Sequence, residues 1–86
     1  MAKYKIQFKK SAVKELNSIP TVDLEKIIIR IQNLADNPRP DGCKKLSKDE
    51  KYRIRIGNYR VLYLIEDNKL IIFIVKIGHR KDVYSK

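Results

Sequence analysis

Three arginines in the second half of the chain have the type and spacing that a phosphate-binding surface needs. Arg53 and Arg55 belong to the segment 52–56, in which arginine alternates with tyrosine and isoleucine, and Arg60 follows soon after. The period of two places Arg53 and Arg55 on one face of a strand, about 6.5–7 Å apart, which is of the order of the distance between adjacent phosphates. Guanidinium groups are permanently charged and present a planar fork of donors to phosphate oxygens. The pattern predicts a phosphate-binding face, although an ordinary solvated sheet face shows the same alternation.

The same arginines would suit the cleavage of RNA by its own 2′-hydroxyl. That reaction builds extra negative charge on the phosphorane, and fixed cations stabilise this charge more in the transition state than in the ground state. It also needs a base and an acid. Histidine is the side-chain type whose ordinary pKa lies near neutrality, so His79, next to Arg80, is a candidate, and Tyr84 is another if nearby arginines lowered its pKa. Taken alone, His79 also fits a turn residue and Tyr84 an exposed aromatic, so these patterns support phosphate binding better than cleavage.

The charge of the chain points to an anionic partner. The 86 residues include 20 Lys and Arg against 10 Asp and Glu, a formal net charge of +10. Residues 44–86 hold 12 basic and 5 acidic side chains, whereas residues 1–43 hold 8 and 5. Nucleic acid or an acidic protein is the expected counterpart. Four lysines are candidates for general attraction to RNA, with a solvated face as the alternative: Lys44, Lys45, Lys48 and Lys51.

Length and composition exclude several classes of protein. The chain has the length of one small domain, expected to span residues 1–86, and its 43% apolar content suffices for a core. Cys43 is the only cysteine, so an internal disulfide is impossible and a reducing cytoplasm is the natural location. One Cys and one His are too few ligands for a zinc finger. The longest apolar run, 70–75, is far too short to span a membrane, and we expect no membrane partner.

The first half of the chain predicts one strand and two helices. Residues 4–8 alternate apolar and polar, as a half-buried strand does. Apolar residues at helical spacing predict a helix over about 9–18, which ends at Ile19-Pro20. A second helix is expected over about 22–35, with Thr21 as its N-cap and an apolar stripe along one face. The two prolines and the glycine of segment 37–42 then predict a turn.

The second half predicts three strands in a meander. Strands are expected over 52–56, 59–65 and 70–77, joined by tight turns at Gly57-Asn58 and Asp67-Asn68. The last strand is apolar on both faces, which is typical of a central strand covered on both sides. The fold class is therefore α+β, in the order strand, helix, helix and three strands (β-α-α-β-β-β). The sheet is expected to be antiparallel, with a two-helix hairpin packed on one face.

Two segments resemble the motifs of the RelE/ParE toxin superfamily. Leu46 and residues 52–63 resemble its core motif, and residues 78–84, GHRKDVY, resemble the closing motif of the RelE branch. The initial strand and two helices fit as well, so the resemblance covers the whole chain. It implies a toxin of a type II toxin–antitoxin system, an mRNA interferase that enters the ribosomal A site and cuts the codon through the RNA 2′-hydroxyl. No metal or other cofactor is implied.

The resemblance also implies partners and site residues. The partners are a cognate RelB-like antitoxin, which would mask the basic surface, and a ribosome with mRNA in its A site. The family's functional positions correspond here to Arg53, Arg55, Arg60, Arg80 and Tyr84. The first two are lysines in RelE. Because arginine hardly loses its proton, a base or acid role would move to Tyr84 or His79, with the arginines stabilising charge.

Two other functions fit the sequence. A ParE-like toxin would share the fold but inhibit DNA gyrase by binding, without nuclease activity. The ParE branch generally lacks the catalytic set, so the presence of the arginines and the tyrosine together favours the nuclease. The remaining alternative is an RNA- or DNA-binding domain without toxicity.

Overall fold

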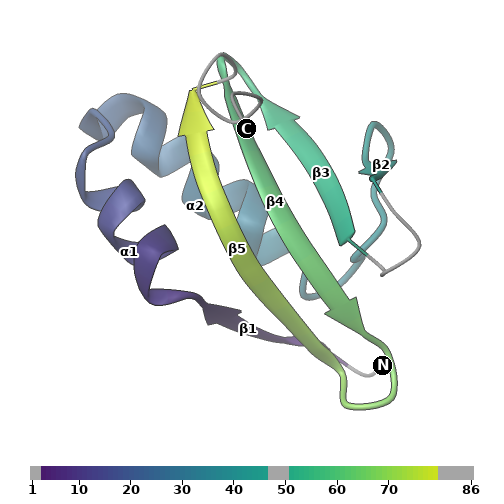
Figure 1. Cartoon of the computed structure of the whole chain (residues 1–86). Coiled ribbons are helices and arrows are strands. Elements are labelled where there is room, and N and C mark those ends of the chain that lie inside the picture. Colours follow the sequence, from purple (N-terminus) through teal and green to yellow (C-terminus); the bar gives the residue numbers. More distant parts are fainter. Residues whose placement is uncertain (1–2, 47–50, 80–86) are drawn as a thin grey trace.

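Two helices cover one face of a five-stranded sheet in the computed structural model (Figure 1). The structure describes residues 3–46 and 51–79. The described elements, in chain order, are β1 (Lys5–Phe8), α1 (Lys10–Asn17), α2 (Thr21–Asn33), β2 (Lys44–Lys45), β3 (Lys51–Ile56), β4 (Tyr59–Glu66) and β5 (Ile71–His79). The strand order across the sheet is β1-β5-β4-β3-β2. None of the described helices is long and apolar enough to cross a membrane.

The predicted α+β class and order of elements are confirmed, with three differences in detail. β1 pairs with β5 in parallel, so the sheet is mixed rather than wholly antiparallel. A two-residue strand, β2, adds to the other edge beside β3. Thr21 is the first helical residue of α2 rather than its cap, because the extended Pro20 precedes the helix and no side chain caps it. These differences leave the three-strand meander as expected.

The core lies between the sheet and the helices. Alternate residues of β3 and β4 point toward the helices and are buried, as the period of two requires. β5 follows the same rule up to Ile74, and an irregularity in its pairing with β4 then shifts the buried position to Ile77. From the helices, Ala12, Ile27 and Ile31 meet these strand residues, and each is at most 1% exposed. The expectation that β5 is covered on both sides is wrong: Ile72 and Ile74 are buried, but Phe73 on the other face is half-buried. No described helix packs on that second face, which we call the open face.

Two tyrosines join the core to the segment that follows α2. Tyr52 of β3 and Tyr63 of β4 are paired across the strands, and their rings stack with centroids 5.9 Å apart. The Tyr63 side chain is fully buried, and its hydroxyl donates a 2.8 Å hydrogen bond to the carbonyl oxygen of Pro38. Burial raises the pKa of Tyr63 well above its ordinary range, so this hydroxyl stays protonated and serves the fold.

A polar cluster of Tyr4, Arg39, Tyr52 and Asp67 ties four distant segments together at one end of the sheet. The Arg39 guanidinium donates to an Asp67 oxygen over 2.9 Å and to the Tyr52 hydroxyl over 3.0 Å. The Tyr4 hydroxyl donates to the other Asp67 oxygen over 2.6 Å. The hydrogen bonds from Arg39 and Tyr4 together hold the pKa of Asp67 below its ordinary 3.8. This cluster closes the loop before β2 onto the β4–β5 turn.

Acid should weaken this cluster. Because the pKa of Asp67 is lowered on folding, its contribution to stability is present above pH 3.8 and is lost as the pH falls through the lowered value. Asp67→Asn should remove that part of the acid dependence. The measurement is the thermal midpoint of both proteins between about pH 2 and 6. Parallel curves for wild type and variant over this range would show that Asp67 makes no such contribution.

Candidate functional site

The β3–β4 hairpin places two of the predicted arginines directly opposite each other. Ile56 pairs with Tyr59 across the two-residue turn Gly57-Asn58, and this register pairs Arg55 with Arg60. Gly57 has a φ of 59° and Asn58 has no positive φ, which is the pattern of a type II′ turn and suits glycine in first place. Directly paired residues share a face, with Cβ atoms about 4.5–5.5 Å apart. The turn therefore fixes the separation of these two guanidinium-bearing side chains.

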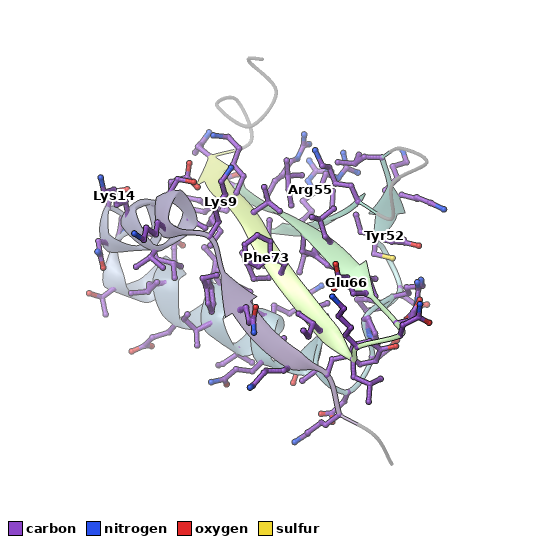
Figure 2. All side chains as sticks on the ribbon, turned by 60° about the horizontal axis from the view of Figure 1, so that its bottom comes forward. Lys9, Lys14, Tyr52, Arg55, Glu66 and Phe73 are labelled. Atoms are coloured by element: carbon purple, nitrogen blue, oxygen red, sulfur yellow. The ribbon has the colours of Figure 1, made fainter. Side chains whose placement is uncertain are left out.

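Arg53 completes a group that we call the arginine face: Arg53, Arg55 and Arg60. Arg53 lies two residues before Arg55 on β3 and so shares its side of the sheet, the open face. Lys44 of β2 pairs with Arg53 and extends the group toward the edge. Arg55 is exposed, Arg53 is half-buried, and the side of β3 that carries Arg55 can be seen in Figure 2. The structure thus brings together the two arginines that the alternation placed on one face and Arg60, which joins them from the neighbouring strand.

Arg60 is the charged residue of this group whose environment is most unusual. It is only 9% exposed, and among the described residues it is the only charged one that is buried. Burying a permanent cation is unfavourable unless other groups compensate, and like charges directly opposite on neighbouring strands repel. The direct pairing with Arg55 is thus unfavourable for stability. Such a placement is typical of a residue kept for binding or chemistry.

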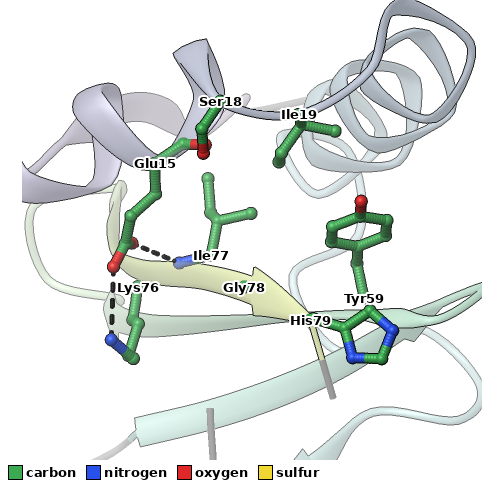
Figure 3. A pocket seen from close by; sticks show the side chains of 8 residues that line it. All are labelled: Glu15, Ser18, Ile19, Tyr59, Lys76, Ile77, Gly78 and His79. Carbon is green, nitrogen blue, oxygen red and sulfur yellow. Dashed lines mark hydrogen bonds and ion pairs between the residues drawn. The ribbon is translucent and has the colours of Figure 1, made fainter. Parts of the chain in front are cut away.

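His79 lies on the other face of the sheet. It pairs with Tyr59 at the end of β5, and the two rings meet edge to face with centroids 5.8 Å apart. Both side chains line a cavity of about 270 Å³ beneath α1, shown in Figure 3, with the apolar Ile19 and Ile77 among its other walls. The structure does not bring His79 together with the arginine face. Gly78, which has no side chain, is the residue of β5 that pairs with Arg60.

Glu15, which no sequence pattern singled out, forms the polar wall of this cavity. Its carboxylate accepts a 2.8 Å hydrogen bond from the Ile77 backbone N–H and forms a 3.2 Å ion pair with the Lys76 ammonium (Figure 3). The partners are more than 60 residues away along the chain, so no local pattern indicates them. The only available signal is that Glu15 lies next to the apolar Leu16 on the inner side of α1.

The remaining predicted residues are only partly within the described chain. Lys44 and Lys45 form β2 and are exposed, and Lys51 begins β3 and is half-buried. Lys48, Arg80 and Tyr84 lie outside the described residues. Within residues 3–46 and 51–79, no group of three or more His, Cys, Asp or Glu side chains is placed to hold a metal ion.

These features define a class of protein: a small, strongly basic α+β domain with a helical hairpin on one side of its sheet and arginines on the other. The sequence model of a family described as "ParE toxin of type II toxin-antitoxin system, parDE" matches residues 6–84. The chain is also 36% identical to the RelE1 protein of Methanocaldococcus jannaschii, covering 96% of this chain and 97% of that protein. This chain therefore belongs to the RelE/ParE superfamily and is a RelE-like toxin of a toxin–antitoxin system.

Two further comparisons agree with the RelE side of the superfamily. The mRNA interferase toxin RelE of Escherichia coli K12 is 25% identical over 96% of this chain and 92% of its own. Among solved structures, RelE in the archaeal RelE–RelB complex from Pyrococcus horikoshii superposes with a TM-score of 0.83 at 30% identity. That comparison covers 91% of this chain and 96% of the other. The fold is thus shared over nearly the whole length.

Proposed function

We propose that this toxin is a ribosome-dependent mRNA endoribonuclease that cleaves the A-site codon through the RNA 2′-hydroxyl, without a metal ion. The observation that carries the proposal is the direct pairing of Arg55 with Arg60, with Arg53 on the same face. The relative from E. coli that is named an mRNA interferase supports the reaction class. In this proposal residues 1–86 act as one domain in the cytoplasm.

The arginine face would act on the scissile phosphate. As the 2′-hydroxyl attacks, charge grows on the equatorial oxygens of the phosphorane, and guanidinium groups fixed on two neighbouring strands stabilise that charge without having to reorganise. Arg55 and Arg60 would contact these oxygens, and Arg53 and Lys44 would hold the neighbouring phosphate. Arg80 is proposed to share the charge-stabilising role. Fixed guanidinium groups would supply the charge that a metal ion supplies in other nucleases.

The base and acid would come from Tyr84 or His79. Arginine is a poor base, so a group with an accessible proton is needed beside the phosphate. In the described part of the chain, His79 sits on the helical side with Tyr59. This position favours Tyr84 for transfer at the phosphate and makes His79 the weaker candidate.

A RelB-like antitoxin is the proposed protein partner. The P. horikoshii relative was solved as a complex of RelE with RelB, which supports this assignment. The net charge of +10 would favour an acidic segment that covers the arginine face and neutralises it. A bound partner would also stabilise the toxin by mass action.

The test is induced expression followed by primer-extension mapping of mRNA, with and without a translation inhibitor. Cuts within codons that require translation would support the proposal. The matching family model carries ParE's name, so ParE-like inhibition of DNA gyrase is the second candidate. Intact mRNA together with a DNA-damage response would support that candidate and contradict the nuclease. Normal growth would contradict both.

The exposed lysines of β2 should affect binding rather than chemistry. Replacing Lys44 and Lys45 with glutamine should weaken binding to a single-stranded RNA and reduce its salt dependence, by about 0.7 in the log–log slope for each phosphate that is no longer neutralised. The cleavage rate at saturating ribosome concentration should change less than about twofold, because general attraction acts before the chemical step. Fluorescence anisotropy at several salt concentrations measures the slope. Lys14→Gln with Lys26→Gln, on the helices, is the control, and an equal weakening there would contradict a specific role for β2.

A further inference from the structure

The end of β5 has a described strand beside it on one side only. β1 pairs with β5 from Ile71 to Ile74, but β5 continues to His79. On the other side, β4 stays paired through Arg60 and Gly78. A strand end held on one side only opens more easily than one held on both. This end of β5 is also where the chain runs on to Arg80.

Glu15 supplies a partner for this end of β5 from α1. One carboxylate oxygen accepts the Ile77 backbone N–H over 2.8 Å, as a neighbouring strand's carbonyl would, and the other pairs with the Lys76 ammonium over 3.2 Å. The Glu15 side chain is 29% exposed, so this pairing is partly shielded from water. A hydrogen bond to a charged acceptor is also stronger than one between neutral groups. Glu15 therefore holds a backbone group rather than only another side chain.

The anchored residue is adjacent to the arginine face. Ile77 pairs with Val61, and the next pair along is Gly78 with Arg60. A shift or twist of β5 at Ile77 would be passed to the row of Arg55, Arg60 and Gly78, since the three strands are hydrogen-bonded side by side. A misplacement of about 1 Å at a catalytic group can cost about a hundredfold in rate.

We infer that Glu15 is a positioning residue for RNA cleavage: it fixes the end of β5 so that Arg60, on the neighbouring strand, meets the phosphate in the right geometry. This inference rests on the proposed function. Glu15 reaches the edge of β5 from α1, and in this inference it acts through the strand rather than by contact with the RNA. For this positioning role, the important group is the carboxylate oxygen that accepts the Ile77 N–H, rather than the negative charge.

The experiment compares Glu15→Ala with Glu15→Gln in the full chain. Glutamine keeps an oxygen acceptor for the Ile77 N–H and removes only the charge that faces Lys76. At saturating programmed ribosomes, Glu15→Ala should lower the single-turnover cleavage rate about tenfold or more, with the half-saturating concentration unchanged. Glu15→Gln should stay within about threefold of wild type. Hydrogen exchange of the Ile77 amide should quicken in Glu15→Ala and much less in Glu15→Gln.

Glu25→Ala, an exposed glutamate on α2, is the matched control and should leave both readouts unchanged. A wild-type rate in Glu15→Ala would overturn the inference and leave the proposed function standing. Equal losses in Glu15→Ala and Glu15→Gln would also overturn it, because the charge rather than the strand anchor would then be responsible. If the wild-type chain fails to cleave mRNA on ribosomes, the proposed function falls, and the role of Glu15 in cleavage falls with it.

Discussion

Replacing Arg60 with methionine should lower the single-turnover rate of mRNA cleavage by about 100-fold or more while the protein stays folded. Removing one preorganised group that stabilises transition-state charge typically costs a factor of about 10²–10³. Arg60 is paired with Arg55 and is only 9% exposed, so its guanidinium is held in one place and little shielded by water. The effect of its removal should therefore be among the largest of any single substitution. Growth arrest on induction should disappear in parallel.

The fold should tolerate this change. Methionine fills a similar volume with an unbranched, adaptable chain and does not bring a charge into a buried position. The free energy of unfolding should stay within about 1.5 kcal/mol of the wild-type value, as measured by urea denaturation. Arg30→Met, on α2 and away from the open face, is the matched control and should retain full activity. Wild-type cleavage by Arg60→Met would contradict the role assigned to the arginine face.

Replacing Tyr63 with alanine should have the largest effect on stability. The side chain is fully buried, its ring stacks on Tyr52, and its hydroxyl binds the Pro38 carbonyl. Truncating a buried aromatic side chain typically costs about 3–5 kcal/mol, which is much of the total stability of a small domain. The variant should be largely unfolded near 37 °C, as followed by circular dichroism. A midpoint close to that of wild type would show that the stacked tyrosines contribute little.

Tyr63→Phe separates the hydroxyl from the ring. The ring still fills the core, but the Pro38 carbonyl is deprived of its donor, so the expected decrease is about 1 kcal/mol in the free energy of unfolding. Tyr59→Phe, at the half-buried tyrosine of the cavity, is the control and should change that free energy by less than about 0.5 kcal/mol. Equal decreases in the free energy of unfolding of the two variants would show that the hydrogen bond to Pro38 makes no particular contribution to stability.

The local part of the structure could be predicted from the sequence because it follows short-range rules. Alternation over 52–56 gave the correct strand and the correct face for Arg53 and Arg55, and the two-residue turn gave their pairing with the next strand. The same period misplaces His79: counted from the buried Ile72 and Ile74, alternation puts it on the open face, whereas an irregularity in the β4–β5 pairing shifts the register and puts it on the helical side with Ile77. No pattern in the sequence indicates this irregularity, so alternation alone could not separate His79 from the arginines.

Long-range pairing could not be predicted in this way. The parallel contact of β1 with β5 joins residues more than 60 positions apart, and hydropathy shows only that each is a strand. The same holds for Glu15 and Ile77, and for Arg39 with Asp67. The half-buried Phe73 shows a further limit of prediction from hydropathy, because an apolar residue on a strand does not reveal whether another element covers it. These features depend on the whole topology rather than on any segment.

The two-residue length of the β3–β4 turn has a consequence for how this toxin can diverge. Side chains alternate between the faces, so inserting or deleting one residue at Gly57-Asn58 would exchange the inner and outer sets of one strand. The core would then receive Arg60, and Tyr59 and Val61 would face outward. A change of length that no bulge absorbs would thus have two costs at once, disruption of the core and separation of the paired cations. The identity of Gly57 is constrained as well, because its positive φ favours glycine, which leaves Asn58 as the turn position most open to change.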